Sequence, residues 1–189
     1  MNNILLGSLG FVLVHLVDWA ALKRLPLLKP LFEFCGTALV VFAIIATTTE
    51  GSRISLPFWT GAIGATLLVF SIMGLIYSLF INLPLHSTYI KTGNSGQLVD
   101  TGLYQLVRHP WLIFFILTMA GLALASRSVD IITAGLWWTA LSVMLIWWQD
   151  RYVFCRMFPN YDVYKQHTPM LIPTPKSVSA FLSQFKAKV

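Results

Sequence analysis

The sequence predicts an all-α integral membrane protein with five transmembrane helices, and composition and charge support this fold class. Hydrophobic residues make up 57% of the 189 residues and charged residues only 11%, against about 25% charged residues in soluble domains. The apolar residues fall in blocks of about 20, the length that a helix needs to cross a bilayer. The net charge of +6 comes from Lys and Arg beside these blocks. That placement is typical of membrane orientation and anionic headgroups rather than nucleic-acid binding.

Five apolar segments account for the predicted spans, within one domain over residues 1–189. They cover about residues 4–22, 31–48, 57–83, 111–125 and 131–148. Pro57 and Pro110 stand where the third and fourth helices would begin, a position that suits proline. Ser128 or Asp130 can cap the fifth helix.

The chain after the fifth span is expected to continue as helix beyond the membrane. The fifth segment continues to Met157, and Pro159 stops it. A short amphipathic piece over residues 161–167 precedes a proline-bearing segment, 169–175. The end, residues 178–189, is expected to form a surface helix with apolar residues on one face.

The distribution of Lys and Arg orients the chain. With five spans, only Arg53 and Arg127 fall on one side of the membrane. The other side receives eleven: Lys23, Arg24, Lys29, Lys91, Arg108, Arg151, Arg156, Lys165, Lys176, Lys186 and Lys188. By the positive-inside rule the N-terminus lies outside, and the C-terminus lies in the cytosol together with the polar stretch 96–110.

That polar stretch ends in Arg108-His109-Pro110 at the mouth of the fourth helix. A cation, an imidazole and a helix-starting proline suit the meeting point of a charged cofactor and a membrane. The fourth and fifth segments form a hairpin, so Arg108 and Asp150 are expected at similar depth. The alternative is a positive-inside arginine beside an interfacial histidine.

Two motifs flank the predicted hairpin. The first reads Leu98-Val99-x-Thr101-Gly102-x-Tyr104-x-x-Val107-Arg108-His109-Pro110, and the second reads Gln149-Asp150-Arg151, then Phe158-Pro159-Asn160-Tyr161-Asp162-Val163-Tyr164. This ordered set, within about residues 97–173, resembles the isoprenylcysteine carboxyl methyltransferase family and its phospholipid methyltransferase relatives.

The resemblance implies S-adenosylmethionine as cofactor, an active site on the cytosolic face, and a small or lipophilic acceptor arriving from the membrane lipids. It implies catalytic roles for Arg108, His109 and Asp150, with no metal. The candidate cofactor-binding residues are Gln97, Leu98, Val99, Gly102, Tyr104, Arg108, His109, Gln149, Asp150, Tyr161 and Tyr164. Residues 1–83 would then be a three-helix scaffold, 84–175 the cofactor-binding loop, hairpin and tail motif, and 176–189 a surface tail.

Each implied role follows from the chemistry of the cofactor. Arg108 and the backbone amides of residues 101–104 could bind its carboxylate, and Asp150 or Gln149 its ribose hydroxyls. Aromatic faces of the tyrosines suit its sulfonium. His109 could orient the cofactor or take a proton from an amine or thiol acceptor. A carboxylate acceptor would need no base.

Three departures from the family pattern keep alternatives open. Gln149 replaces an acid, Leu112 and Phe114 stand where a tyrosine and a glycine are common, and Phe158-Pro159 replaces Phe-Gly. An altered acceptor or a non-catalytic binding or scaffold relative would fit them. A sterol-type membrane reductase shares a similar Arg-His-Pro region, but the sequence carries no Gly-x-Gly-x-x-Gly run to support a nicotinamide site.

Ionisable residues also occur inside the predicted spans. His15 and Asp18 lie three residues apart in the first span, and Glu33 opens the second. Such groups are functional candidates by default. Asp18 and Glu33 could instead form interfacial pairs with Lys23, Arg24 or Lys29, so both a structural role and a role in the acceptor site are open.

Overall fold

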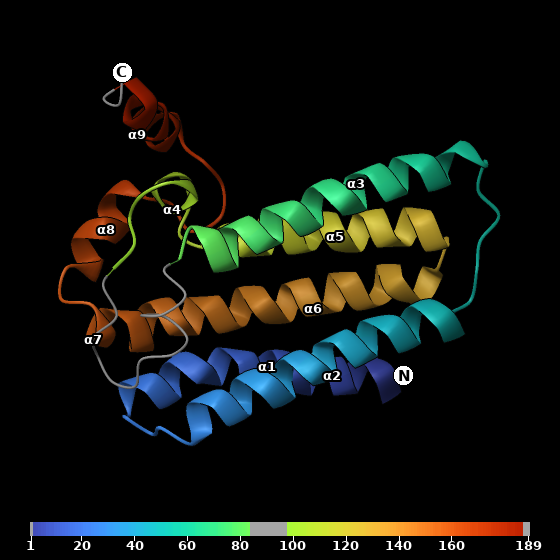
Figure 1. Cartoon of the computed structure of the whole chain (residues 1–189), viewed down its shortest axis with the longest axis horizontal. Coiled ribbons are helices and arrows are strands. Elements are labelled where there is room, and N and C mark those ends of the chain that lie inside the picture. The colour runs from blue at the N-terminus through green and yellow to red at the C-terminus, as the bar shows by residue number, and fades with distance from the viewer. Residues whose placement is uncertain (1, 84–97, 187–189) are drawn as a thin grey trace.

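The computed structural model describes residues 2–83 and 98–186, and these residues form a bundle of helices (Figure 1). An isolated bridge between Arg53 and Ser128 is the β interaction among them. In chain order the elements are α1 (Asn2–Leu22), α2 (Leu28–Glu50), α3 (Trp59–Ile76), the π-helical turn η1 (Tyr77–Ile81), α4 (Leu103–Leu106), α5 (Pro110–Ser126), α6 (Val129–Trp148), the π-helical turn η3 (Gln149–Val153), α7 (Phe154–Met157), α8 (Tyr161–His167) and α9 (Pro175–Lys186). The all-helical prediction is confirmed for the described residues.

Glycines bring the long helices together in two close pairs. A Cβ added to Gly10 of α1 would lie 2.8 Å from the carbonyl oxygen of Gly36 in α2. A Cβ on Gly64 of α3 would lie 2.4 Å from the backbone nitrogen of Ala125, and one on Gly121 would lie 3.0 Å from the Gly64 carbonyl oxygen. Small residues let helix backbones approach in this way. The α1–α2 and α3–α5 pairs therefore pack backbone to backbone.

Helix α6 lies between the two pairs (Figure 1). Its Trp138 is fully buried, and the indole nitrogen donates to the Ile4 carbonyl at 3.1 Å. The neighbouring Trp137 donates to Ser8 Oγ at 2.9 Å. These bonds fix α6 against α1. The buried core around them comprises Phe11, Ala43, Leu112, Phe115, Met119, Ala134, Trp138 and Ile146.

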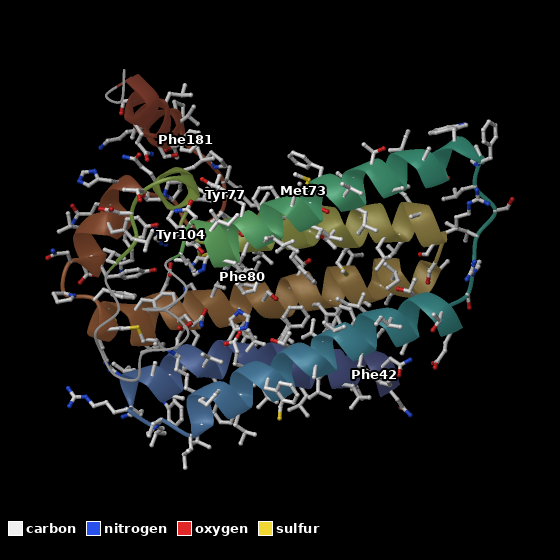
Figure 2. All side chains as sticks on the ribbon, in the orientation of Figure 1. Phe42, Met73, Tyr77, Phe80, Tyr104 and Phe181 are labelled. Atoms are coloured by element: carbon white, nitrogen blue, oxygen red, sulfur yellow. The ribbon has the colours of Figure 1, made fainter. Side chains whose placement is uncertain are left out.

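Four helical stretches are long and apolar enough to cross a membrane: Asn2–Leu22, Leu28–Glu50, Trp59–Ile81 and Val129–Met157. The predicted fourth span is the apolar helix α5, which has 17 residues and is shorter than the other four. Apolar side chains such as those of Phe42 and Met73 project from the outside of the bundle (Figure 2). An apolar exterior is what a lipid-facing bundle presents.

The predicted helix ends agree with the observed ones within a few residues, and the short helix α4 is the one described helix that was not predicted. Helix α9 begins at Pro175 rather than at residue 178. Thr174 Oγ1 accepts a hydrogen bond from the Ser177 amide at 3.2 Å, and Ser177 Oγ accepts one from the Thr174 amide at 3.0 Å. This reciprocal cap, with proline in the first helical position, starts the helix early.

The described positive residues divide between the two ends of the bundle. The loops that carry Arg53 and Arg127 meet at one end, where the Ile54 amide donates to the Arg127 carbonyl at 2.9 Å. The α1–α2 turn, η1, α4, α7 and α8 gather at the opposite end (Figure 1). Lys91 and Lys188 lie outside the described residues. The grouping agrees with the charge count from sequence, while the side of the membrane that each end faces stays a prediction.

Candidate functional site

The Arg108-His109 motif lies in the short link between α4 and α5, and the C-terminal segment holds its backbone. The Arg108 amide donates to the Pro169 carbonyl at 2.9 Å, and the His109 amide donates to the Met170 carbonyl at 3.2 Å. Pro110 is the first residue of α5, as its fixed φ and missing N–H favour. The motif is therefore fixed between a helix start and the predicted proline-bearing tail.

Asp150, in η3, accepts hydrogen bonds from three side chains. Arg108 donates to its Oδ2 from Nε at 3.0 Å and from Nη2 at 2.5 Å. His109 Nε2 lies 2.9 Å from Oδ1, and the Tyr161 hydroxyl donates to the same oxygen. Arg108 Nη1 also donates to the Thr168 carbonyl at 2.6 Å. The side chains of Arg108 and Asp150 are only 11% and 8% exposed, so this is a buried ion pair with its hydrogen bonds satisfied.

Two tyrosines of α8 close the site. Burial and the adjacent Asp150 carboxylate hold the pKa of Tyr161 well above its usual range. Burial likewise raises the pKa of Tyr164, whose hydroxyl donates to the Tyr104 carbonyl at 2.5 Å. Both hydroxyls are therefore protonated donors at neutral pH. Phe154 stacks on His109 at 6.1 Å and packs edge-on against Tyr161 at 5.5 Å, which completes an aromatic wall.

Gln149 links the motif to the first helix. Its side-chain amide donates to the Asp18 carboxylate at 2.8 Å and to the His15 carbonyl at 3.2 Å. Lys29 is an attractive electrostatic neighbour of both Asp18 and Glu33, as the predicted interfacial pairing expects, whereas Glu33 repels Asp18. The bond to Gln149 was not predicted, and only the three-residue spacing of His15 and Asp18 hinted that both face one direction. The Asp18 carboxylate of α1 therefore lies against Gln149, the position at which the family pattern has an acid.

A cavity of about 610 Å³ lies next to these residues. From the motif side it is lined by Arg108, His109, Gln149, Tyr104, Tyr161 and Tyr164, and from the first two helices by His15, Asp18, Lys29 and Glu33. Deeper in the bundle its walls are apolar side chains of α1, α2, α3 and α5. The cavity therefore joins a polar end to an apolar interior, and its volume is within the range of about 300–1,000 Å³ usual for small-molecule sites.

Not every predicted site residue faces this cavity. Leu98 and Val99 line it, whereas Asp150 and Gly102 are not among its lining residues. Asp150 stands behind Arg108, His109 and Tyr161 and positions them. Gln97 lies outside the described residues. The roles proposed for these residues stay predictions.

The backbone conformation and close surroundings of position 102 explain why glycine stands there. The Gly102 φ of +61° favours glycine, and an added Cβ would lie 2.4 Å from Asn82 Oδ1. Its amide donates to Gln184 Oε1 at 2.9 Å, and the Leu103 amide donates to Asn82 Oδ1 at 2.8 Å. These amides, expected from sequence to bind a cofactor carboxylate, already have protein acceptors. Arg108 is then the better candidate for that contact.

Comparison with known proteins identifies the family. Residues 59–157 match the phospholipid methyltransferase family, a segment of more than half of the chain. The protein belongs to the phospholipid methyltransferase family. The family segment runs from α3 through α7 and includes Arg108, His109 and Asp150. The chain is therefore a member of a membrane methyltransferase family, as the motifs predicted, while α1, α2 and α8 lie outside the matched segment.

A curated relative carries a different kind of name. The nickel-cobalt-cadmium resistance protein NccN of Alcaligenes xylosoxydans xylosoxydans is 28% identical over 85 residues. The likeness covers 45% of this chain and 40% of NccN, less than half of either protein. Within the part of the chain that the structure describes, no group of three or more His, Cys, Asp or Glu could hold a metal ion. No solved structure matches this chain.

Proposed function

We propose that this protein transfers a methyl group from S-adenosylmethionine to a lipophilic or small acceptor that reaches the site from the membrane. The observation that carries the proposal is one cavity shared by the Arg108-His109 motif of the family segment and the apolar walls of the bundle. A charged cofactor and a lipophilic acceptor need such a combination of surfaces in one place.

The residues at the polar end fit the cofactor. Arg108 lines the cavity and directs three N–H groups at Asp150 and Thr168. A guanidinium has five N–H donors, so its remaining donors can bind a carboxylate. Tyrosine rings suit a sulfonium, and the Gln149–Asp18 pair suits ribose hydroxyls. When bound, the cofactor supplies an electrophilic methyl group.

The chain's own residues would orient the reactants rather than form covalent bonds with them. Asp150 holds Arg108, His109 and Tyr161 in fixed positions through its four hydrogen bonds. The aromatic wall of Phe154, Tyr161 and Tyr164 excludes water from the polar end. Alignment of nucleophile, methyl and leaving sulfur is the main requirement of an in-line displacement, and a rigid, dry site supplies it.

The acceptor has a lateral route into the cavity. Val41 of α2 and Ile72, Ile76 and Phe80 of α3 and η1 line the cavity and are also 41–49% exposed on the apolar flank of the bundle. The cavity therefore opens between α2 and α3, toward the region that lipid would occupy. We propose that α5 also crosses the membrane, as the fourth of five spans in chain order, with the N-terminus outside and the site on the cytosolic face.

A non-catalytic scaffold of the same family is the second candidate. The observation in its favour is that Gln149 replaces a family acid and that its amide is already bonded to Asp18. A nicotinamide-dependent reductase is the third candidate, and the family match to phospholipid methyltransferases weighs against it.

Equilibrium binding of S-adenosylmethionine to the purified protein in detergent tests the proposal. S-adenosylhomocysteine and NADPH serve as competitors. Arg108→Ala should weaken binding about 10-fold or more, because hydrogen bonds to charged groups contribute about 1.5–3 kcal/mol. Arg53→Ala is the matched control, since Arg53 is exposed at the opposite end of the bundle.

Each outcome separates the candidates. Saturable binding that S-adenosylhomocysteine displaces, and that Arg108→Ala but not Arg53→Ala weakens, supports the methyltransferase. Folded protein that binds neither S-adenosylmethionine nor NADPH supports the scaffold. Binding of NADPH alone supports the reductase.

A further inference from the structure

His15 of α1 lies in the wall of the cavity, although α1 is outside the family segment. The residue is 3% exposed. Its Nδ1 lies 2.7 Å from the Phe11 carbonyl oxygen, and its ring packs edge-on against Trp111 at 5.5 Å. Both contacts fix the orientation of the imidazole.

The Phe11 contact determines the tautomer. A carbonyl oxygen can only accept a hydrogen bond, so Nδ1 carries the proton. In a neutral imidazole Nε2 is then a bare acceptor. An imidazolium would place a charge within a helix long enough to span the membrane, which is costly. His15 therefore presents an acceptor nitrogen.

That nitrogen has no partner among the described residues. His15 Nε2 is one of three buried side-chain atoms there without a hydrogen bond; the others are Thr47 Oγ1 and Ser142 Oγ. Of these three residues His15 alone lines the cavity. An unsatisfied buried acceptor costs about 1–3 kcal/mol, and a ligand that donates to it would remove that cost.

The surroundings of His15 favour a proton-bearing ligand. Asp18, one turn along α1, and Glu33 of α2 line the same cavity with carboxylates. Lys29, His109 and Gln149 also face it, so the acidic groups are partly balanced. A donor such as an amine or a thiol matches the Nε2 acceptor, whereas an ionised carboxylate carries no proton to give.

We infer that His15 is the base of the methyl transfer, binding a primary amine or thiol acceptor through Nε2. This inference rests on the proposed function. The acceptor's lone pair forms a bond to the methyl carbon, and the carbon–sulfur bond of the sulfonium donor breaks with its electron pair left on sulfur as a thioether. The proton of the acceptor's N–H or S–H group passes to Nε2. The positive charge lost from the sulfonium thus appears on the imidazolium of His15, in a cavity that Asp18 and Glu33 also line.

Binding of simple probes tests the assignment without turnover. Dodecylamine and dodecanethiol carry the protic group on an apolar chain, and dodecanoate carries a carboxylate instead. His15→Leu should weaken binding of the amine and thiol at least 10-fold and leave dodecanoate unchanged. His167→Gln, a change of an exposed histidine on α8, is the control and should alter none of them.

A second variant and a spectrum keep the test independent of folding. His15→Gln retains an acceptor oxygen without a useful base, so it should keep acceptor affinity and lower the methylation rate about 100-fold or more, as loss of a general base does. In the wild type labelled with ¹⁵N-histidine, the Nε2 resonance of His15 should shift when dodecylamine or dodecanethiol is added.

Clear results would overturn the inference. It is wrong if folded wild-type protein binds neither protic probe, if His15→Leu binds them as tightly as wild type, or if the His15 resonance does not move. Failure of S-adenosylmethionine to bind would instead reject the proposed function. The two failures are distinguishable because the probe experiment uses no cofactor.

Discussion

Arg108 and Asp150 are 42 residues apart in the chain, yet two hydrogen bonds, of 3.0 and 2.5 Å, join the guanidinium to a single carboxylate oxygen, Oδ2. The other oxygen is occupied by His109 and Tyr161. One carboxylate therefore connects the start of α5, the end of α6 and α8. Asp150 is not itself among the residues that line the cavity, but it is hydrogen-bonded to three that are, Arg108, His109 and Tyr161.

Loss of that carboxylate should destabilise the fold as well as the site. In Asp150→Ala the buried guanidinium of Arg108 loses its counter-ion, and breaking a buried pair from one side costs about 3–5 kcal/mol. The Arg108→Ala, Asp150→Ala double variant should lose less than the sum of the two single variants, since neither charge is left alone. Denaturant titration of the detergent-solubilised protein measures this, and additive losses would show that the two residues are not coupled.

Removal of the Tyr161 hydroxyl should loosen the same network. Tyr161→Phe keeps the ring against Phe154 but removes the donor to Asp150, and a hydrogen bond to a charged group contributes about 1.5–3 kcal/mol. Tyr152→Phe is the control because Tyr152 is exposed. Equal unfolding midpoints for the two variants would contradict the structure.

Stability should fall at alkaline pH partly through Tyr161. Its pKa is raised in the folded protein, so above about pH 10, the ordinary tyrosine value, the unfolded chain loses this proton while the folded chain keeps it. The free energy of unfolding then decreases as pH rises. Tyr161→Phe should show a shallower decrease above pH 10 than wild type, with Tyr152→Phe unchanged. Parallel curves for all three proteins would rule out this contribution.

The close packing of α3 against α5 should depend on the absence of a side chain at Gly64. In Gly64→Ala the new methyl group would meet the Ala125 backbone nitrogen at 2.4 Å, whereas Gly61, on the same helix, has nothing within 4 Å of an added Cβ. Gly64→Ala should lower the thermal unfolding midpoint, because backbone cannot move aside as a flexible side chain can. Gly61→Ala should leave it unchanged or raise it, since alanine is the better helix former. A similar drop in both variants would place the cause outside this contact.

Single cysteines should report opposite sides of the membrane at positions 53 and 176. Both residues are exposed, and the two native cysteines, Cys35 and Cys155, would first be replaced by alanine. An impermeant maleimide should label position 53 in intact cells and position 176 only after permeabilisation. The reverse pattern would show that the orientation is opposite to the one proposed. Labelling of both positions from outside would show that the number of spans between them is even rather than odd.

The sequence alone determined where the helices lie. The apolar blocks, Pro110 at a helix start and Pro159 as a break are local features, so they predicted the long helices and α8 within a few residues, whereas the short helix α4 was not predicted. The two motifs predicted the family because residue types at fixed spacing are visible without coordinates. The convergence of Arg108 and Asp150 followed from the hairpin between the motifs.

Only the tertiary structure decided which faces of the helices meet. These helices are apolar on most sides, so hydropathy does not distinguish a lipid-facing surface from a packed one, and close contacts such as Gly10–Gly36 select the pairs. That packing brings Asp18 to Gln149 and places His15 in the cavity wall, contacts between segments more than 130 residues apart. It also assigns the Gly102 amide to Gln184 rather than to a ligand. Each of these depends on long-range geometry, which residue spacing does not encode.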